Sequence, residues 1–399
     1  MQICSVLYDI IDLMKTVAFS TDDTRYMARA IQIARQGLYS THPNPRVGCV
    51  IVNDGSIVGE GWHQIAGQGH AEVNALVQAG EQSKGATAYV TLEPCSHFGR
   101  TPPCSQALID AGISRVVGAM QDPNPLVSGN GYNLLREQGI EVSCGLLATE
   151  SEQLNSGFIK RMSVGKPWVR VKSAMSADGR TAMASGESHW ITGAGARQDV
   201  QRLRARSEAI ITGIDSVLID DPSLTVRPET WINDDEWPNI LAEPIQPLRV
   251  ILDSQLRTPA TAKMLTLPGN TLIVCATENA PRQAALEAAG AEVLCLPNKE
   301  ASTKVDLDAL LTELASREVN DVLVETGATT AGAFVQQGLV DEWVLYMAPT
   351  LMGSDARPVL LMPGIDTMKN KLSLTMKEVK HVGDDLCIHY TIPCAVGKS

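Results

Sequence analysis

Two short segments, about two dozen residues apart, most constrain what this 399-residue chain can fold into. The first runs from His70 to Glu72, and the second contains Cys95 after a proline and is followed by Cys104. One histidine and two cysteines can hold a zinc ion that keeps a fourth position open for water, and zinc lowers the pKa of that water from about 15.7 to about 7. The carboxylate of Glu72 can then carry protons. The set predicts a site for metal-assisted hydrolysis.

The residues around these segments predict that the zinc ligands lie at helix starts. His70 opens a run with apolar residues at helical spacing, and this run ends at Gly80. The alternating segment 86–92 predicts a strand that leads to Cys95, and the proline before that cysteine ends the strand so that the next helix can begin at Ser105. We therefore expect a metal site between two helix starts.

Local chemistry alone leaves other interpretations open. A His-x-Glu sequence is common by chance in soluble proteins, and a structural zinc site would need a fourth cysteine or histidine. His97 is a candidate for that fourth ligand, but we expect it to line the pocket because it lies in an unusually long loop. In zinc nucleobase deaminases a glutamate in the position of Glu72 is not a ligand. It relays a proton from the attacking water to the ring nitrogen and then to the leaving ammonia.

The long loop makes the family recognisable. Eight residues separate Cys95 from Cys104, whereas the general zinc-deaminase pattern has two between its cysteines. Together with the segments Thr41–Gly48 and Gln121–Pro125, this loop resembles the bifunctional riboflavin-biosynthesis deaminase/reductase family, over about residues 22–393. The resemblance implies zinc-dependent deamination of 2,5-diamino-6-ribosylamino-4(3H)-pyrimidinone 5′-phosphate. It also implies a following NADPH-dependent reduction of the ribosyl group to ribityl.

Composition bears on partners and location. The net charge of −12 argues against a nucleic-acid partner, because such binding depends on Lys and Arg that neutralise phosphates. This weakens the main alternative, a nucleic-acid-editing zinc deaminase with an accessory domain, although charge can be local. Nine cysteines without a regular framework suit a reducing compartment, so we expect a cytoplasmic protein. No run approaches the roughly 18 apolar residues of a membrane span, and we expect no membrane partner. Family analogy favours a homodimer.

Alternating strands and helices predict an α/β protein of two domains. We expect an N-terminal extension of unknown role over 1–20, a zinc deaminase domain over 21–160 and an NADPH-dependent reductase domain over 161–399. The pattern loosens around 148–166, and antiparallel strands are expected at the C-terminal end. The resemblance implies a cytidine-deaminase-like three-layer α/β domain followed by a dihydrofolate-reductase-like α/β domain. The strands expected in the second domain are 167–175, 208–213, 248–253, 271–276, 292–296, 321–325, 342–348 and 386–392.

The segment 322–333 predicts a cofactor site. It combines a strand, a glycine-containing turn and a helix start, where free backbone N–H groups can bind phosphate. The Gly-x-Gly-x-x-Gly spacing is absent, so a plain tight turn is the alternative. The family resemblance implies that the segment binds NADPH. The cofactor-binding residues that it implies are Ala174, Trp190, Ser216, Asp220, Ser254, Gly327, Ala328, Thr329, Thr330, Ala331, Gly332 and Ala333.

Several residues are candidates for substrate binding. Asn44 is expected to hydrogen bond the pyrimidine, although its Pro-Asn-Pro context equally suits a turn residue. Guanidinium groups match phosphate oxygens bidentately, so we expect Arg204 and Arg227 at the substrate phosphate; an exposed helix face is the alternative for Arg204. The resemblance places Ser188 beside them. It also implies substrate contacts for Lys172, Leu224 and Glu325.

Overall fold

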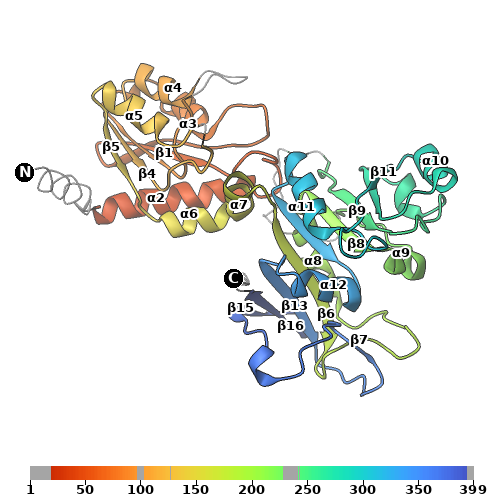
Figure 1. The fold of residues 1–399 in the computed structure, drawn as a ribbon. Helices are drawn as coiled ribbons and strands as arrows, with labels where there is room; N and C mark the ends of the chain where they lie inside the picture. The colour runs from red at the N-terminus through yellow and green to blue at the C-terminus, as the bar shows by residue number, and fades with distance from the viewer. Residues whose placement is uncertain (1–18, 97–102, 126, 228–240, 242, 393–399) are drawn as a thin grey trace, which may run out of the picture. The chain divides into compact units, whose positions relative to one another are not determined.

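The computed structural model of this chain describes residues 19–96, 103–125, 127–227, 241 and 243–392 (Figure 1). Contacts divide the chain into two units. Among the described residues, the first unit comprises 19–41 and 45–155, and the second comprises 42–44 and 156–392. Within these ranges, no helix combines the length and the apolar character that a membrane crossing requires.

The first unit is built on a five-stranded sheet of order β2-β1-β3-β4-β5. β1 pairs antiparallel with β2 and β3, whereas β3, β4 and β5 are parallel. The strands are β1 Gly48–Asn53, β2 Ser56–Trp62, β3 Thr87–Val90, β4 Arg115–Gly118 and β5 Glu141–Cys144. The helices are α2 Thr21–Ala34, α3 Ala71–Ala79, α4 Cys104–Asp110, α5 Asn130–Glu137 and α6 Ala148–Leu154.

Helices cover both faces of this sheet, which confirms the expected three-layer architecture (Figure 1). Successive residues of β1 point to opposite faces and are buried on both. Cys49 and Ile51 pack in a cluster with α3, α4 and α5, and Val50 and Val52 pack in a second cluster with α2. The strand therefore reads as a continuous apolar run.

Helix α2 begins with a side-chain cap. Ser20 is the N-cap, and it forms a capping box with Asp23. The Asp23 carboxylate also accepts hydrogen bonds from Tyr89 Oη at 2.7 Å and Arg115 Nη1 at 2.7 Å. Burial raises the pKa of Asp23, but these bonds together hold it well below its usual value. One carboxylate thus joins α2 to β3 and β4.

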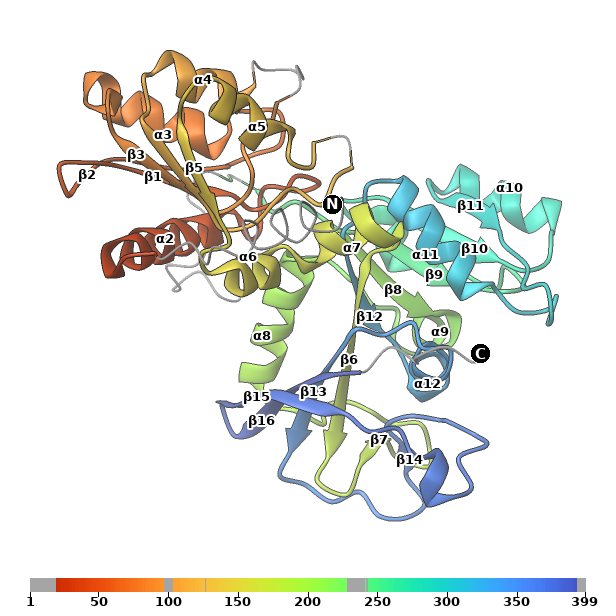
Figure 2. The same ribbon diagram turned by 60° about the vertical axis from the view of Figure 1, so that its left-hand side comes forward.

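The second unit contains a nine-stranded sheet of order β11-β10-β9-β8-β12-β6-β13-β16-β15 (Figure 2). Its strands are β6 Trp168–Ser176, β8 Ala209–Gly213, β9 Leu248–Leu252, β10 Thr271–Cys275, β11 Glu292–Cys295, β12 Asp321–Glu325, β13 Glu342–Ala348, β15 Thr375–Val382 and β16 Asp385–Thr391. β7 Arg180–Ala182 and β14 Arg357–Pro358 form a separate pair. Its helices are α7 Ser156–Val164, α8 Ala194–Ala205, α9 Ile214–Asp220, α10 Ala280–Ala288, α11 Leu307–Ser316 and α12 Ala328–Gln336.

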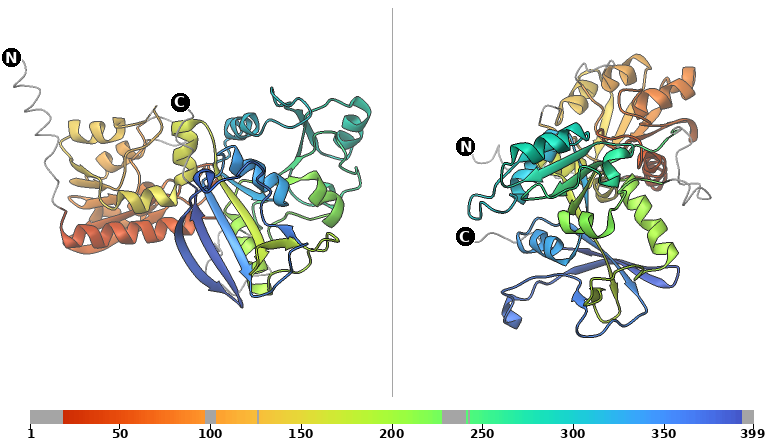
Figure 3. Two further views of the ribbon diagram at one scale, coloured as in Figure 1. Left: turned by 60° about the horizontal axis from the view of Figure 1, so that its bottom comes forward. Right: turned by 90° about the vertical axis from the view of Figure 1, so that its right-hand side faces the viewer.

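The pairing in the larger sheet changes from parallel to antiparallel at its last two strands in the chain. All strands from β11 to β13 are parallel, and β16 and β15 continue the sheet antiparallel, which confirms the expected antiparallel end. Figure 3 shows these blue strands in the same sheet as the yellow-green β6, with β13 between them. Core residues of α11 and α12 pack on one face, and those of α8, α9 and α10 pack on the other. A parallel sheet covered on both faces typically binds ligands at the carboxyl ends of its strands.

The region around 148–166 is more regular than the sequence pattern indicates. It forms α6 and α7 with Asn155 between them. The buried side of α6 is polar: the Ser151 hydroxyl donates to the Thr91 carbonyl at 2.6 Å, and Asn155 exchanges hydrogen bonds with the backbone of Arg46. Because hydrogen bonds replace an apolar stripe, hydrophobic periodicity gave no signal here.

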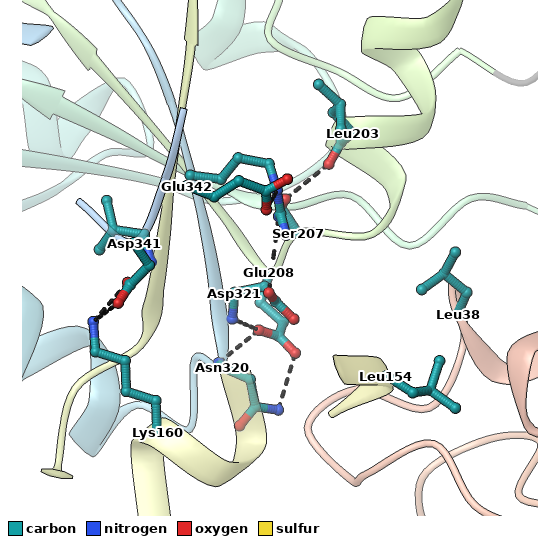
Figure 4. A network of polar contacts seen from close by, with 12 residues as sticks. Leu38, Leu154, Lys160, Leu203, Ser207, Glu208, Asn320, Asp321, Asp341 and Glu342 are labelled. Atoms are coloured by element: carbon teal, nitrogen blue, oxygen red, sulfur yellow. Dashed lines mark hydrogen bonds and ion pairs between the residues drawn. The ribbon is translucent and has the colours of Figure 1, made fainter. Parts of the chain in front are cut away.

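Charged side chains form hydrogen bonds and an ion pair at the amino ends of the parallel strands (Figure 4). The Glu208 carboxylate accepts the backbone N–H groups of Asn320 and Asp321, both at 2.6 Å. Lys160 binds Asp341 at 2.6 Å. These contacts provide hydrogen-bond partners for backbone and side-chain groups at the amino ends of the strands. The predicted cofactor segment lies at the carboxyl ends.

A buried ion cluster in this sheet predicts a pH-dependent stability. Glu342 bridges Arg170 at 2.7 Å and His389 at 2.7 Å. Burial lowers the pKa of His389, but hydrogen bonds to Cys387 and Glu342 raise it to about 9 overall. Since the unfolded pKa of histidine is about 6.5, the stabilisation is complete below that pH and is lost as pH rises through about 9.

We therefore expect the thermal midpoint of the second unit to fall between pH 7 and pH 9.5. His389→Gln should flatten this dependence, while His381→Gln, on exposed β15, should leave it unchanged. Differential scanning calorimetry across this range makes the comparison. An identical pH slope in wild type and His389→Gln would show that the cluster does not act this way.

Candidate active sites

The three predicted zinc ligands come together in the first unit. His70 is the N-cap of α3, Cys104 is the first residue of α4, and Cys95 lies in the loop after β3. Their ligand atoms all lie within 4.8 Å of one another. His70 Nδ1 lies 3.2 Å from Cys104 Sγ and 3.6 Å from Cys95 Sγ. Tetrahedral zinc with usual bond lengths separates a nitrogen and a sulfur ligand by about 3.6 Å, so the three residues fit the metal.

The protonation of the two thiols also suits a metal. A hydrogen bond from the Cys104 thiol lowers the pKa of Cys95 to about 4, with help from His70 and from the Cys104 backbone N–H at 3.3 Å. The same hydrogen bond raises the pKa of Cys104. A site that already stabilises one thiolate is prepared for a cation, because zinc binds cysteine as thiolate.

Glu72 lies beside the ligands without joining them. It is the second residue of α3, its side chain is buried, and its carboxyl interacts with Cys104. Its oxygens are not among the ligand atoms that lie within 4.8 Å of one another. Burial raises the pKa of Glu72 to about 7, the range in which a carboxyl both accepts and donates protons at neutral pH.

The structure reveals a supporting residue that the sequence analysis missed. Glu93, buried two residues before Cys95, accepts four backbone N–H groups of the segment 122–132. The donors are Asp122 at 3.1 Å, Gly129 at 2.9 Å, Gly131 at 2.8 Å and Tyr132 at 3.4 Å. A Cβ at Gly131 would lie 1.9 Å from the Pro94 carbonyl oxygen, so the two segments are closely packed. One carboxylate therefore holds the loop of a zinc ligand against the start of α5.

We expect Glu93→Gln to destabilise the first unit. The amide keeps one acceptor but turns an NH₂ group toward backbone donors, and a lost hydrogen bond to a charged group costs about 1.5–3 kcal/mol. The thermal midpoint of this unit should fall by about 5–10 °C. Glu137→Gln, an exposed change at the end of α5, is the matched control. Equal midpoints for the two variants, measured by calorimetry, would contradict this role.

Two further side chains support the His70 segment. Asn74 donates to the Trp62 carbonyl at 2.8 Å, and His63 lies with its Nδ1 3.2 Å from the Gly69 carbonyl oxygen. The rings of His63 and His70 meet edge to face at 5.3 Å between centroids. Both contacts fix the turn that precedes α3. The sequence carried no signal for them, because each partner lies in a different strand or turn.

Two sequence predictions for the first site remain untested. His97 lies outside the described residues. Asn44 belongs by its contacts to the second unit, so its relation to the zinc ligands stays a prediction.

A buried charge cluster lies in the second unit at the carboxyl end of its parallel sheet. Lys172 of β6 and Glu325 of β12 are directly opposite in the strand register. Arg204 of α8 binds both oxygens of Glu325, with Nε at 2.7 Å and Nη2 at 2.9 Å. The fork of Arg204 therefore faces Glu325, while its Nη1 donates to the Thr225 carbonyl at 3.2 Å.

The charges of this cluster favour an anionic ligand. Burial lowers the pKa of Lys172, and the charge of Glu325 opposes that effect. Burial raises the pKa of Glu325, but Arg204, Lys172 and Arg227 together hold it below its usual value. The charges of Arg204, Lys172 and Arg227 all act on this one carboxylate, and such cationic groups can bind an anion such as phosphate.

The predicted cofactor segment has the expected form. Gly327 is the N-cap of α12 and provides no side-chain cap, so the first N–H groups of this helix are free for a ligand. The Gly213 N–H donates to Thr326 Oγ1 at 3.1 Å, which joins the end of β8 to the same turn. A Cβ at Gly332 would lie 2.0 Å from the Leu361 carbonyl oxygen, so this helix requires glycine there. These features fit a phosphate-bearing cofactor.

The remaining predicted residues lie in or near segments at the carboxyl ends of the parallel strands, and their environments differ. His189 Nε2 lies 3.0 Å from Asp220 Oδ1 and joins the loop that contains Ser188 to the end of α9. Trp190 is 71% exposed, and Arg197 lies 4.7 Å above its ring. By contrast, the Leu224 side chain is buried in the apolar cluster beneath α8. Ser216 is part of α9, Ser254 follows β9, and Ala174 is part of β6.

Family models match both units. The model described as "Cytidine and deoxycytidylate deaminase zinc-binding region" matches residues 20–120, and "RibD C-terminal domain" matches residues 167–388. "Riboflavin biosynthesis protein RibD" of Escherichia coli (strain K12) is 50% identical over 370 residues, covering 92% of this chain and 98% of the relative. The protein of the same name from Haemophilus influenzae is 46% identical over 379 residues, covering 94% and 98%.

Solved structures agree with this similarity. The structure "Acinetobacter baumannii RibD, form 2" superposes with a TM-score of 0.84 at 46% identity, covering 93% of this chain and 99% of that one. A Thermotoga maritima diaminohydroxyphosphoribosylaminopyrimidine deaminase/5-amino-6-(5-phosphoribosylamino)uracil reductase has a TM-score of 0.78 at 30% identity, covering 93% and 99%.

Fold and sites together define a bifunctional enzyme in which a zinc-dependent deaminase domain precedes an NADPH-dependent reductase domain. The two alignments cover nearly all of this chain and nearly all of each relative. The chain belongs to the RibD family of riboflavin biosynthesis proteins. The alternative of a nucleic-acid-editing deaminase is not favoured, because residues 167–388 match the reductase domain of this family.

Proposed function

We propose that the first unit removes the 2-amino group of 2,5-diamino-6-ribosylamino-4(3H)-pyrimidinone 5′-phosphate, and that the second unit reduces the ribosyl group of the product to ribityl. The observation that carries the proposal is the ligand set of His70, Cys95 and Cys104 with buried Glu72 beside it but outside it. Supporting it, the name of the similar Thermotoga maritima protein combines a deaminase and a reductase of phosphoribosylaminopyrimidines.

In the deamination, Glu72 is the acid-base group. Zinc held by the three ligands supplies a Lewis acid that lowers the pKa of water. Glu72 takes a proton from the attacking water and passes it to the ring nitrogen next to the amino-bearing carbon. It then takes the proton of the newly added hydroxyl group and delivers it to the departing amino group, so that water and amine become carbonyl and ammonia. Burial of Glu72 excludes bulk water from this exchange.

In the reduction, the charge cluster acts on the ribose. Bound NADPH supplies the hydride for carbon C1′. Lys172 gives a proton to the ring oxygen O4′ as the C1′–O4′ bond opens, and Glu325 favours the charged form of Lys172 that holds this proton. Arg204 orients Glu325 through its two hydrogen bonds. The cationic groups Arg204 and Arg227 bind the substrate phosphate.

The other assignments are extensions of this proposal. Asn44 hydrogen bonds the pyrimidine of the deaminase substrate. Ser188 and Leu224 contact the reductase substrate, Leu224 through its main chain because its side chain is buried. The cofactor contacts are Ala174, Trp190, Ser216, Asp220, Ser254 and the segment 327–333. We also propose a homodimer in the cytoplasm that binds neither nucleic acid nor membrane, and the free thiols of the seven described cysteines support a reducing compartment.

Removal of zinc tests the division of labour between the units. A chelator such as dipicolinate should abolish ammonia release from the diamino substrate, because His70, Cys95 and Cys104 then hold no metal. The same protein should still oxidise NADPH when given the deaminated substrate. Added zinc should restore ammonia release. Ammonia release that continues in protein shown by mass spectrometry to lack zinc would contradict the proposal.

A further inference from the structure

Two cysteines that neither active site uses lie opposite each other at one side of the large sheet. Cys275 is the last residue of β10, Cys295 is the last residue of β11, and the parallel register pairs them directly. Both are free thiols. Adjacent strands are separated by about 4.8 Å, which is within the range of about 4.4–6.8 Å that Cα atoms span across a disulfide.

The two side chains share one face of the sheet but differ in exposure. Cys275 is 1% exposed within the apolar cluster that includes Ile273 and Leu286. Cys295 is partly buried and packs against the same cluster. Side chains directly opposite on neighbouring strands point to the same face and contact each other. The outer thiol can therefore meet a small oxidant, and the inner thiol lies behind it.

The position of β11 gives this pair room to adjust. β11 is the outermost strand on its side of the sheet and has four residues. Within the sheet it has one neighbour, β10, with four residue pairs. The Leu296 N–H continues this pairing by donating to the Cys275 carbonyl at 2.8 Å, and Arg317 binds the Glu292 side chain at the start of β11. Edge strands open more readily than central strands, because fewer hydrogen bonds hold them. The small backbone adjustment that brings the pair to the commonest disulfide separation, about 5.5–6 Å between Cα atoms, is thus least costly at this side.

The two thiols have distinct chemical roles. Burial, and to a smaller extent the hydrogen bond with Cys295, raises the pKa of Cys275 to about 12. Cys275 therefore stays protonated at neutral pH, and the more exposed Cys295 is the thiol that an oxidant reaches first. This order matches the usual pairing of an accessible peroxide-reactive cysteine with a nearby resolving cysteine.

We propose that Cys275 and Cys295 form a reversible thiol–disulfide site that responds to hydroperoxides. The Cys295 thiolate attacks the O–O bond of the hydroperoxide, forming an S–O bond and releasing hydroxide or alkoxide. The Cys275 sulfur then attacks the Cys295 sulfenic acid and loses its proton. An S–S bond forms, and water leaves. Two thiols are oxidised by two electrons, and the hydroperoxide is reduced to water or an alcohol. A low-molecular-weight thiol returns the pair to its reduced form.

The chain contains a matched control for this pair. Cys144 is also the last residue of a four-residue parallel edge strand, β5, and is also partly exposed. It lies opposite Gly118. Cys144 therefore shares the strand environment of Cys295 but has no cysteine in register. If Cys295 forms a disulfide and Cys144 does not, the cause is the cysteine opposite Cys295 and not exposure at a sheet edge alone.

The test uses full-length, zinc-loaded protein treated with graded hydrogen peroxide, quenched with catalase and digested with trypsin without reductant. Mass spectrometry should find peptide 264–282 joined to peptide 283–299, with the loss of two hydrogens and full reversal by dithiothreitol. Cys295→Ser and Cys275→Ser should each abolish the link, while Cys144→Ser should leave it unchanged. Circular dichroism checks that each variant is folded. Oxidation of Cys295 to sulfinic acid without a link in wild type, or no oxidation there at all, would overturn the proposal.

Discussion

Replacing Glu72 with glutamine is expected to lower the rate constant of deamination by about 10²- to 10⁴-fold, the usual contribution of a positioned acid-base group. Glutamine has nearly the volume of glutamate, so the buried start of α3 should keep its packing. An amide cannot take the proton of the attacking water. Zinc should remain at one ion per chain because Glu72 is outside the ligand set. Ammonia release and metal analysis of the same sample measure both quantities.

The control for this experiment is Glu81→Gln, an exposed change in the first unit. It should retain ammonia release and zinc. NADPH-dependent reduction of the deaminated substrate should be unaffected in both variants. Loss of zinc from Glu72→Gln would mean that the carboxylate is a ligand, and ammonia release within about threefold of wild type would mean that it is not the acid-base group.

Lys172→Met is expected to produce the largest loss in the second activity. Methionine keeps the length and the apolar stem of lysine in its buried position, but it cannot donate a proton to O4′. We expect kcat/KM for the deaminated substrate to fall by about 10²-fold or more. Glu325 keeps its two hydrogen bonds to Arg204, so the local structure should persist. NADPH oxidation measured against substrate concentration gives the parameter.

Lys166→Met is the matched control for this change. Lys166 precedes β6 and pairs with Asp308 away from the cluster. It should leave reduction nearly unchanged, and both variants should release ammonia at the wild-type rate. A Lys172→Met enzyme with kcat/KM within about threefold of wild type would remove Lys172 from the proposed chemistry.

The strands of the large sheet were predictable because of their burial. β8, β9, β10, β12 and β13 are covered on both faces, so each appears in the sequence as a short apolar run between turns. Their observed bounds lie within a residue of the expected ones. β15 was missed because it is an exposed edge strand without apolar alternation. The helix α6 was missed because its buried residues are polar and are satisfied by hydrogen bonds.

Site residues were also predictable where a short segment identifies them, and not where their role depends on residues far away in the sequence. The zinc ligands occupy short segments whose residue types and helix starts are visible in the sequence, so they were predictable together. The pairing of Arg204 with Glu325 joins residues 121 positions apart, and no local pattern specifies it. Glu93 resembles an ordinary acid before a proline. Its role depends on backbone groups 29 to 39 residues further along the chain.

In the proposed function, one chain carries out two successive reactions in a fixed order. The most direct test follows NADPH consumption by the zinc-loaded protein after addition of the diamino pyrimidinone ribosylamino phosphate, with Glu72→Gln in parallel. We predict consumption by the wild type, consumption slower by about 10²-fold or more in the variant, and full recovery in the variant when the deaminated compound is supplied. Consumption by Glu72→Gln from the diamino compound at the wild-type rate would contradict the order, and no consumption from either compound would contradict the reductase assignment.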